Sequence, residues 1–153
     1  MIILCDTREQ NPLQFEHPYV EGTENVTLSV GDYCVRYKDT HQPPIYFERK
    51  SLPDLFGTMG KGYKRFRKEI MRSKDNKSEL IIIIEGTVTD ILRGTKYSQV
   101  DGLKILRTIL SVWDKYKVVS VFCKDRSEMA LFIAEYYCAY ARNRVRNKNG
   151  LRQ

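Results

Sequence analysis

Two carboxylates and a lysine lie close together in the chain as Asp32, Glu48 and Lys50. Residues 33–37 and 45–47 are rich in β-branched and aromatic side chains, and a polar loop with two prolines separates them, so segment 31–54 predicts a β-hairpin. Side chains alternate between the faces of a strand, so Glu48 and Lys50 share one face about 6–7 Å apart. We expect the hairpin register to place Asp32 opposite Lys50.

These three side chains have the chemistry of a metal-dependent nuclease. Mg²⁺ takes oxygen ligands and keeps several waters, so Asp32 and Glu48 could hold one ion. Such an ion lowers the pKa of its water and neutralises charge on a phosphate. Lys50 would position or deprotonate that water, or balance charge in the transition state. The alternative is an edge hairpin with solvated charges, because three residues match so loose a pattern often by chance.

The longer string around these residues is more specific. It consists of Gly31-Asp32, then Glu48-Arg49-Lys50, then Asp54. This order resembles the GD…ERKxxxD signature of the XPF-type structure-specific endonucleases, and the resemblance covers about the first 85 residues well. Upstream, residues 6–8 (Asp-Thr-Arg) resemble the Asp-x-Arg element of that family, and residues 62–66 resemble its following arginine-bearing helix.

The resemblance implies a three-layer, mixed-sheet α/β fold of the restriction-endonuclease-like type. It implies an endonuclease that uses Mg²⁺ or Mn²⁺ to hydrolyse phosphodiester bonds, at branched or flap DNA in repair, recombination or replication. Asp32 and Glu48 would bind the metal, with Asp6 as a further candidate ligand, and Lys50 would activate or orient the water. The supporting side chains, which would bind phosphate or brace the carboxylates, would be Arg8, Arg49, Arg65 and Asp54. By parity, Arg49 points away from Glu48 and Lys50.

Two other functions compete with this one. The same fold could form a non-catalytic DNA-binding or scaffold subunit, although a lapsed site has no need of both carboxylates. A regulatory protein-interaction domain that uses the last helix is the third hypothesis. Larger family members carry a C-terminal tandem helix-hairpin-helix domain for which 153 residues leave no room. We therefore expect a partner protein, or the basic helix and tail, to select the DNA structure.

Composition agrees with a nucleic-acid partner without requiring one. The net charge of +7 and the pI of about 9.2 favour a polyanion, although a basic domain of another function has the same balance. Four cysteines without a C-x-x-C pair, and only two histidines, argue against a zinc site and for a reducing compartment. With no signal peptide and no apolar run longer than 80–84, we expect a cytoplasmic protein, or a nuclear one in a eukaryote, that is not secreted.

In the first half of the chain, strands must position these residues. Residues 2–5 predict a buried strand that delivers Asp6 to its end, 10–25 a loop, and 26–30 a second strand that ends at Gly31. We expect Gly31 to supply either a bulge or an unusual backbone angle. Ser51 can cap a short helix with Pro53 in its first turn, and 57–62 follows as a flexible loop. Residues 63–74 then predict a helix. The basic residues near it, which we expect to contact phosphates, are Lys61, Lys64, Arg67 and Lys68.

The second half of the chain alternates strands with helices. Residues 80–84 predict a central strand covered on both faces, and 118–122 a second buried strand. Between them, Thr87 and Ser98 can cap two helices, with Trp113 in the core. The last helix, 127–144, is apolar around most of its circumference, so it either packs within the monomer or forms half of an interface with a second copy or another protein. We expect one domain over 1–145 and a basic tail over 146–153 that is either disordered or a DNA-binding arm.

Overall fold

A six-stranded mixed sheet forms the centre of the protein. The computed structural model describes residues 1–150, and the side chains of 1–147. The strands are β1 (Ile2–Asp6), β2 (Gly22–Val26), β3 (Tyr33–Arg36), β4 (Ile45–Ser51), β5 (Glu79–Glu85) and β6 (Ser120–Cys123). Their order across the sheet is β2-β1-β3-β4-β5-β6. β3 is antiparallel to both β1 and β4, whereas β1–β2, β4–β5 and β5–β6 are parallel.

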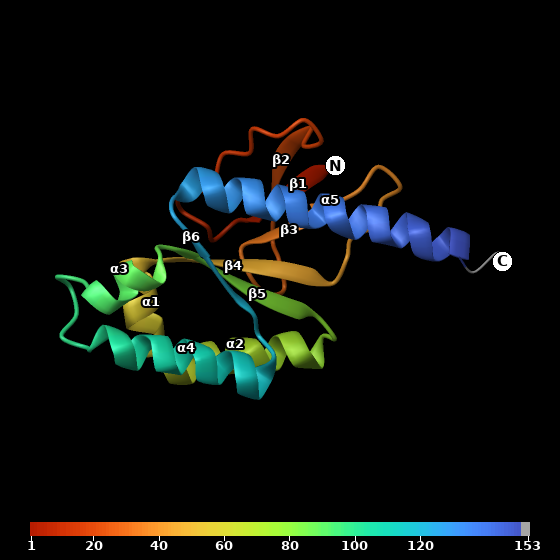
Figure 1. Ribbon diagram of the computed structural model, residues 1–153. Coiled ribbons are helices and arrows are strands. Elements are labelled where there is room, and N and C mark those ends of the chain that lie inside the picture. Colours follow the sequence, from red (N-terminus) through yellow and green to blue (C-terminus); the bar gives the residue numbers. More distant parts are fainter. Residues whose placement is uncertain (151–153) are drawn as a thin grey trace.

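Helices cover both faces of this sheet (Figure 1). The helices are α1 (Leu52–Met59), α2 (Tyr63–Asp75), α3 (Val88–Arg93), α4 (Gly102–Tyr116) and α5 (Arg126–Gly150). In Figure 1, α5 lies along the upper side of the sheet, and α1, α2 and α4 lie below it. The arrangement is the predicted three-layer α/β architecture. No helix in the described range is long and apolar enough to cross a bilayer.

Two hydrophobic cores lie between the layers, and β5 supplies both of them. Ile81 and Ile83 belong to the cluster under α5, whereas Ile82 and Ile84 belong to the cluster that α1, α2 and α4 cover. This division follows from the alternation of side chains along a strand. It explains why the predicted central strand is a continuous apolar run, since both of its faces are buried.

Local sequence signals start the short helices as predicted. The Ser51 hydroxyl accepts a hydrogen bond from the Asp54 N–H and caps α1, with Pro53 in the first turn. Thr87 and Asp90 form a capping box at the start of α3. The predicted loop 57–62 is shorter than expected, because α1 continues through Met59. Ser51 therefore turns the chain from β4 directly into the helix that borders the candidate site.

The predicted strand at 26–30 is wrong. The strand is instead β2, which ends at Val26, and it pairs with β1 as a polar edge strand. Leu28 and Val30 are buried, as their apolar character suggested, but no strand ladder includes them. The Leu28 N–H donates to the carboxylate of Asp6 instead of to a neighbouring strand. An alternating apolar pattern therefore marked buried side chains here without marking a strand.

Two predictions for α4 are also wrong, namely its cap and the burial of Trp113. Asp101, not Ser98, caps the helix, and the side chains it buries include Ile105, Ile109 and Val112. Trp113 was expected in the core but is 41% exposed. α4 carries two apolar stripes of similar period. The stripe of β-branched residues, Ile105, Ile109 and Val112, packs against the sheet, whereas Trp113 lies on the other stripe.

The last helix, α5, begins at Arg126 and continues through Gly150. Leu151 and the residues after it lie outside the described part, so the predicted domain boundary and the predicted tail stay predictions.

Candidate active site

Asp32, Glu48 and Lys50 come together where β3 begins and β4 ends. The strands pair at Tyr33 and Phe47, and the Asp32 N–H donates to Phe47 O at 2.8 Å. The Asp32 carboxylate in turn accepts the Arg49 N–H at 2.8 Å. Asp32 therefore lies beside residues 47–49, and the predicted register that placed it opposite Lys50 is wrong. The observed register differs from the predicted one by two residues, and such a shift leaves every side chain on the same face, so the matching of faces did not determine the register.

Gly31 supplies the backbone conformation that brings Asp32 to this place. Its φ angle is +67°, in the left-handed region that other residues disfavour. A Cβ atom at this position would lie 3.0 Å from Phe47 O and 3.1 Å from the Cβ of Tyr46. The expectation of an unusual backbone angle at this glycine is confirmed. Any larger residue would push β3 away from β4 and carry Asp32 with it.

The Glu48 and Lys50 side chains are in direct contact. Lys50 Nζ donates to Glu48 Oε1 at 2.6 Å, and both side chains are largely buried. The other oxygens, Glu48 Oε2 and Asp32 Oδ1, accept no hydrogen bond from the described residues. Ser120 Oγ is the one enclosed side-chain polar atom in that range without a partner, so the two carboxylate oxygens open onto a cavity. The site therefore presents two free acidic oxygens next to an ammonium group.

Burial and mutual repulsion disfavour the charged forms of the two acids. Burial is the main cause that raises the pKa of Asp32 to about 6. Burial also raises the pKa of Glu48, and the negative charge of Asp32 raises it further. Burial acts to lower the pKa of Lys50, but the attraction and hydrogen bond of Glu48, together with the negative charges of Asp32 and Glu69, outweigh burial and raise it. The ammonium group of Lys50 is thus stable at neutral pH, whereas the two acids lack enough positive charge nearby.

This donor set fits a divalent cation. Two carboxylate oxygens that face one cavity, with raised pKa values, are the groups that a hard cation such as Mg²⁺ or Mn²⁺ binds and deprotonates. No group of three or more His, Cys, Asp or Glu side chains within residues 1–147 is arranged to hold a metal ion. The site is consequently an open one, in which water and phosphate oxygens would complete the coordination.

Asp6 lies at the end of β1, as predicted, but its carboxylate is fully engaged. It accepts hydrogen bonds from Arg8 N at 2.8 Å, Arg8 Nε at 2.6 Å, Arg8 Nη2 at 3.1 Å and Leu28 N at 2.7 Å. These bonds lower the pKa of Asp6 in spite of its burial. A role for Asp6 as a metal ligand stays a prediction, and this geometry favours a structural role that orients Arg8.

Arg49 points away from Glu48 and Lys50, which confirms the prediction from strand parity. Its guanidinium binds Glu9 through Nε at 2.9 Å and Nη2 at 3.3 Å, and Nη1 lies 3.6 Å from Glu85 Oε2. The Arg49 and Glu9 side chains are only 10% and 7% exposed. Glu9 was not singled out from the sequence, because its partner is distant along the chain. The buried pair fixes the backbone whose N–H holds Asp32.

Basic side chains from α2 face the carboxylates. A cavity of about 460 Å³ is lined by Arg8, Gly31, Asp32, Glu48, Arg65, Lys68, Glu69 and Arg72. Arg65, Lys68 and Arg72 follow one another at helical spacing, so one face of α2 borders the site. Glu69 lies on the same face and was also missed; an acidic residue four positions after Arg65 was the signal that could have found it. The side chains of Lys61, Lys64 and Arg67 are exposed but do not line this cavity.

Asp54 borders the site from α1. Its carboxylate accepts the Ser51 hydroxyl at 2.8 Å. Asp54 and Lys50 line a cavity of about 500 Å³ together with Asp32, Glu48 and Arg126. No described hydrogen bond joins Asp54 to Lys50 or to an arginine. Its supporting role therefore stays a prediction, and the structure assigns it the start of α1.

The sequence and the fold of this chain are both similar to those of known proteins. Residues 5–136 match the family described as the ERCC4 domain. A search of curated proteins found no match. One solved structure with a similar fold is XPF from Aeropyrum pernix, with a TM-score of 0.69 and 19% identity, covering 96% of this chain and 69% of that one. The same archaeal protein in complex with DNA also has a TM-score of 0.69 and 19% identity, over 93% and 66% of the two chains. The shared fold confirms the predicted restriction-endonuclease-like architecture.

Proposed function

The chain belongs to the ERCC4 domain family, and from this membership together with the site geometry we propose that it is a metal-dependent DNA endonuclease. The observation that carries the proposal is the contact of Lys50 with Glu48 beside Asp32, at the mouth of an open cavity. A second carboxylate with a free oxygen would serve no purpose in a purely structural site. The alternative, a non-catalytic scaffold, leaves the raised pKa values of both acids without a function.

Each residue has a distinct part in the proposed reaction. Asp32 and Glu48 would hold Mg²⁺ or Mn²⁺. Such an ion would neutralise charge on the phosphate and lower the pKa of a bound water. Lys50 Nζ, which stays protonated at neutral pH, would orient the attacking water and stabilise negative charge that develops on the phosphate. The raised pKa of Lys50 makes the orienting role more suitable than that of a general base.

The DNA backbone would lie across the face of α2 that borders the cavity. Arg65, Lys68 and Arg72 line that cavity and would contact phosphates on either side of the scissile bond. A similar structure, that of the archaeal XPF, was determined in complex with DNA. From family membership we infer that the substrate is branched or flap DNA in repair, recombination or replication.

Pairing through the last helix completes the proposal. Leu131 and Phe132 on α5 are 53% and 37% exposed, although both are large apolar side chains. A second copy of the chain, or a different partner, would cover them. Sedimentation of the wild type and of Leu131→Asp at micromolar concentration tests the point. A wild-type protein that sediments as a monomer at every concentration tested, as Leu131→Asp does, would contradict pairing with a second copy.

The test of the nuclease uses labelled duplex, 3′-flap, 5′-flap and fork DNA with Mg²⁺, Mn²⁺ or EDTA. Wild type is compared with Asp32→Asn and Lys50→Ala, and the matched controls are Asp114→Asn and Lys115→Ala on the exposed side of α4. We expect metal-dependent cutting that falls about 10²–10⁴-fold in both site variants and is unchanged in both controls. DNA binding without cutting by wild type, in either metal, would favour the scaffold function instead.

A further inference from the structure

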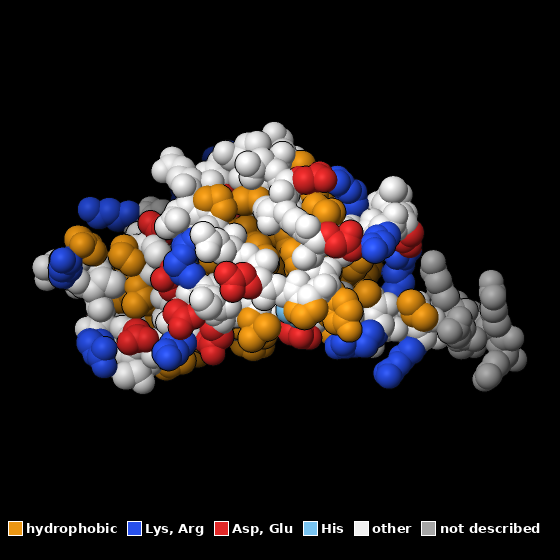
Figure 2. Space-filling view, turned by 90° about the horizontal axis from the view of Figure 1, so that it is seen from above, with side chains coloured by type: hydrophobic (Ala, Val, Ile, Leu, Met, Phe, Trp, Pro, Cys, Tyr) orange, Lys and Arg blue, Asp and Glu red, His pale blue; other side chains and the backbone are white. Residues whose placement is uncertain are grey.

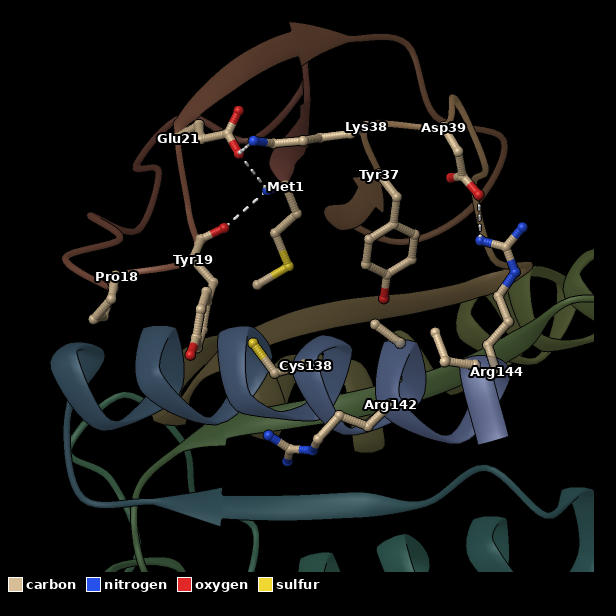
Figure 3. Close-up of a pocket in the computed structure, with 12 residues that line it drawn as sticks. Met1, Pro18, Tyr19, Glu21, Tyr37, Lys38, Asp39, Cys138, Arg142 and Arg144 are labelled. Atoms are coloured by element: carbon tan, nitrogen blue, oxygen red, sulfur yellow. Dashed lines mark hydrogen bonds and ion pairs between the residues drawn. The ribbon is translucent and has the colours of Figure 1, made fainter. Parts of the chain in front are cut away.

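A groove lies on the side of the molecule remote from the candidate active site. It has a volume of about 690 Å³ and lies between the C-terminal half of α5 and the segments around Met1, Tyr19 and Tyr37. Figure 3 shows these segments facing α5 across the opening. Met1 precedes β1, whereas Asp6 ends it, so the full length of that strand separates the groove from the site edge. In Figure 1 the N-terminus lies toward the upper right and α1 toward the lower left.

The walls of the groove are mainly apolar. Met1 and Cys138 are buried at its base, and Ala141 forms part of the helix wall. At its edges, Tyr19 and Val145 are 67% and 58% exposed, among the most exposed large hydrophobic side chains of the described chain. Figure 2, which views the molecule from above, shows hydrophobic side chains gathered beside the last helix, with Lys and Arg side chains near them. Exposed apolar area of this kind is characteristic of a binding surface.

The side chains that line the groove carry a net positive charge, with Lys38, Arg142 and Arg144 against Glu21 and Asp39. Glu21 accepts from the Met1 amine and lies 3.2 Å from Lys38 Nζ, and Asp39 pairs with Arg144 at 2.9 Å. Both carboxylates of the lining are therefore already neutralised. Arg142 has no ion-pair partner within the described residues, and Figure 3 draws none for it. A ligand that fills the groove consequently gains most if it carries negative charge next to its apolar part.

We propose that this groove binds a short segment of a partner protein that presents one or two large apolar side chains followed by acidic residues. The apolar side chains would cover Tyr19 and Val145, and an acidic residue would pair with Arg142. A second copy of this chain is a poor occupant of this groove, because the groove is itself positive and the chain carries a net charge of +7. Contact of two copies through Leu131 and Phe132 would use another part of α5, outside the groove. The apolar walls also disfavour a DNA backbone, because charged phosphates would lose water there without covering the apolar surface. The proposal does not depend on the nuclease activity.

The experiment selects random peptides displayed on phage against the folded wild-type chain. Ala141→Trp, which fills the groove, serves for counter-selection, and Arg142→Glu tests the charge. Arg107→Glu on α4 is the matched control, since it is equally exposed but distant from the groove. Enriched peptides are then synthesised with a fluorophore and titrated with each variant, and thermal melts verify that every variant is folded.

We expect the enriched peptides to share a large apolar residue next to Asp or Glu. Their affinity should fall about tenfold or more in Arg142→Glu and in Ala141→Trp, and should be unchanged in Arg107→Glu. Exchanging the acidic residue of the peptide for Lys should restore binding to Arg142→Glu. Peptides that bind all four proteins equally, or that carry no acidic residue, would overturn the proposal. So would a labelled single-stranded oligonucleotide whose binding depends on Arg142 when no peptide depends on it.

Discussion

Glu9 holds Arg49 through two hydrogen bonds in the interior of the protein, and the backbone N–H of Arg49 holds Asp32. A buried salt bridge is weak evidence for stability as such, because desolvation offsets much of the attraction. Here the pair joins the segment after β1 to the end of β4. Its consequence is positional, since it determines where the carboxylate of Asp32, the proposed metal ligand, lies. Glu9 is therefore a positioning residue that does not touch the reacting atoms.

Replacement of Glu9 by Gln should reduce cleavage without weakening DNA binding. The guanidinium would lose its charged partner, and the 48–50 backbone would relax, so we expect kcat to fall about 10–100-fold while KM changes little. Loss of one partner of a buried pair should also lower the free energy of unfolding by about 3 kcal/mol. Steady-state kinetics and urea denaturation measure the two effects. Glu16→Gln on an exposed loop is the matched control, and equal loss of activity in that variant would contradict the positional role.

Much of the site could be predicted because it depends on local rules. The alternation of side chains along residues 45–51 placed Glu48 and Lys50 on one face and Arg49 on the other, and the structure agrees. Gly31 was expected to adopt an unusual backbone angle, and it does. Such features follow from strand geometry and from one residue type, without knowledge of distant contacts.

The remaining features depend on contacts between segments that are distant in the chain. Glu9 meets Arg49 across 40 positions, which no local pattern encodes. The sequence predicted Leu28 to lie in a strand, but in the structure its N–H donates to the carboxylate of Asp6. Trp113 lies on one of two apolar stripes of α4, and only the packing of the branched stripe decides which one is buried. The local pattern of apolar residues predicts where strands and helices can form, but contacts between distant segments determine which strand forms and which helix face is buried.

Neutralising Asp32 should stabilise the metal-free protein. The pKa of Asp32 is raised to about 6 in the folded state, above the value of about 4 in the unfolded chain, so its charged form opposes folding. Wild-type stability should therefore decrease as pH rises from about 4 to 6, and Asp32→Asn should remove the part of this decrease that Asp32 causes, while buried Glu48 continues to contribute its own part. Above pH 6 we expect Asp32→Asn to be more stable by about 1–3 kcal/mol. Urea denaturation in EDTA at several pH values measures it. Asp114→Asn, which is exposed, should change little.

In Mn²⁺, wild type should become more stable than variants that lack one of the two proposed metal-binding carboxylates. A cation that binds the folded state alone stabilises it by RT ln(1 + [L]/Kd), about 2.7 kcal/mol at a hundred times Kd. Wild type should gain this stabilisation, and Glu48→Gln should gain almost none, because one ligand has lost its charge. Thermal melts with increasing Mn²⁺, together with calorimetric titration, measure the effect without any cleavage assay. Stabilisation of Glu48→Gln equal to that of wild type would remove Glu48 from the metal site.

Asp6→Asn separates a structural carboxylate from a metal ligand. The pKa of Asp6 is lowered in the folded state, so its charge stabilises folding above about pH 4, and this contribution is lost as pH falls toward the folded pKa. The substitution should therefore destabilise the protein at pH 7, by about 2–4 kcal/mol, and less at a pH below the folded pKa of Asp6. Mn²⁺ affinity at pH 7 should change less than twofold. A loss of Mn²⁺ affinity comparable to that in Asp32→Asn would instead make Asp6 a ligand.

The two sides of α2 should contribute differently to DNA processing. Arg65 and Lys68 line the cavity beside Glu48, whereas Lys64 and Arg67 are exposed outside it. Alanine at both positions of either pair removes the same charge, so each double variant should lower the slope of log affinity against log salt by up to about 2. Only the Arg65–Lys68 pair should also reduce kcat, because its cations face the scissile phosphate. Salt titrations of binding and single-turnover cleavage at saturating protein measure the two quantities. Equal cleavage rates in both double variants would show that α2 acts by non-specific attraction alone.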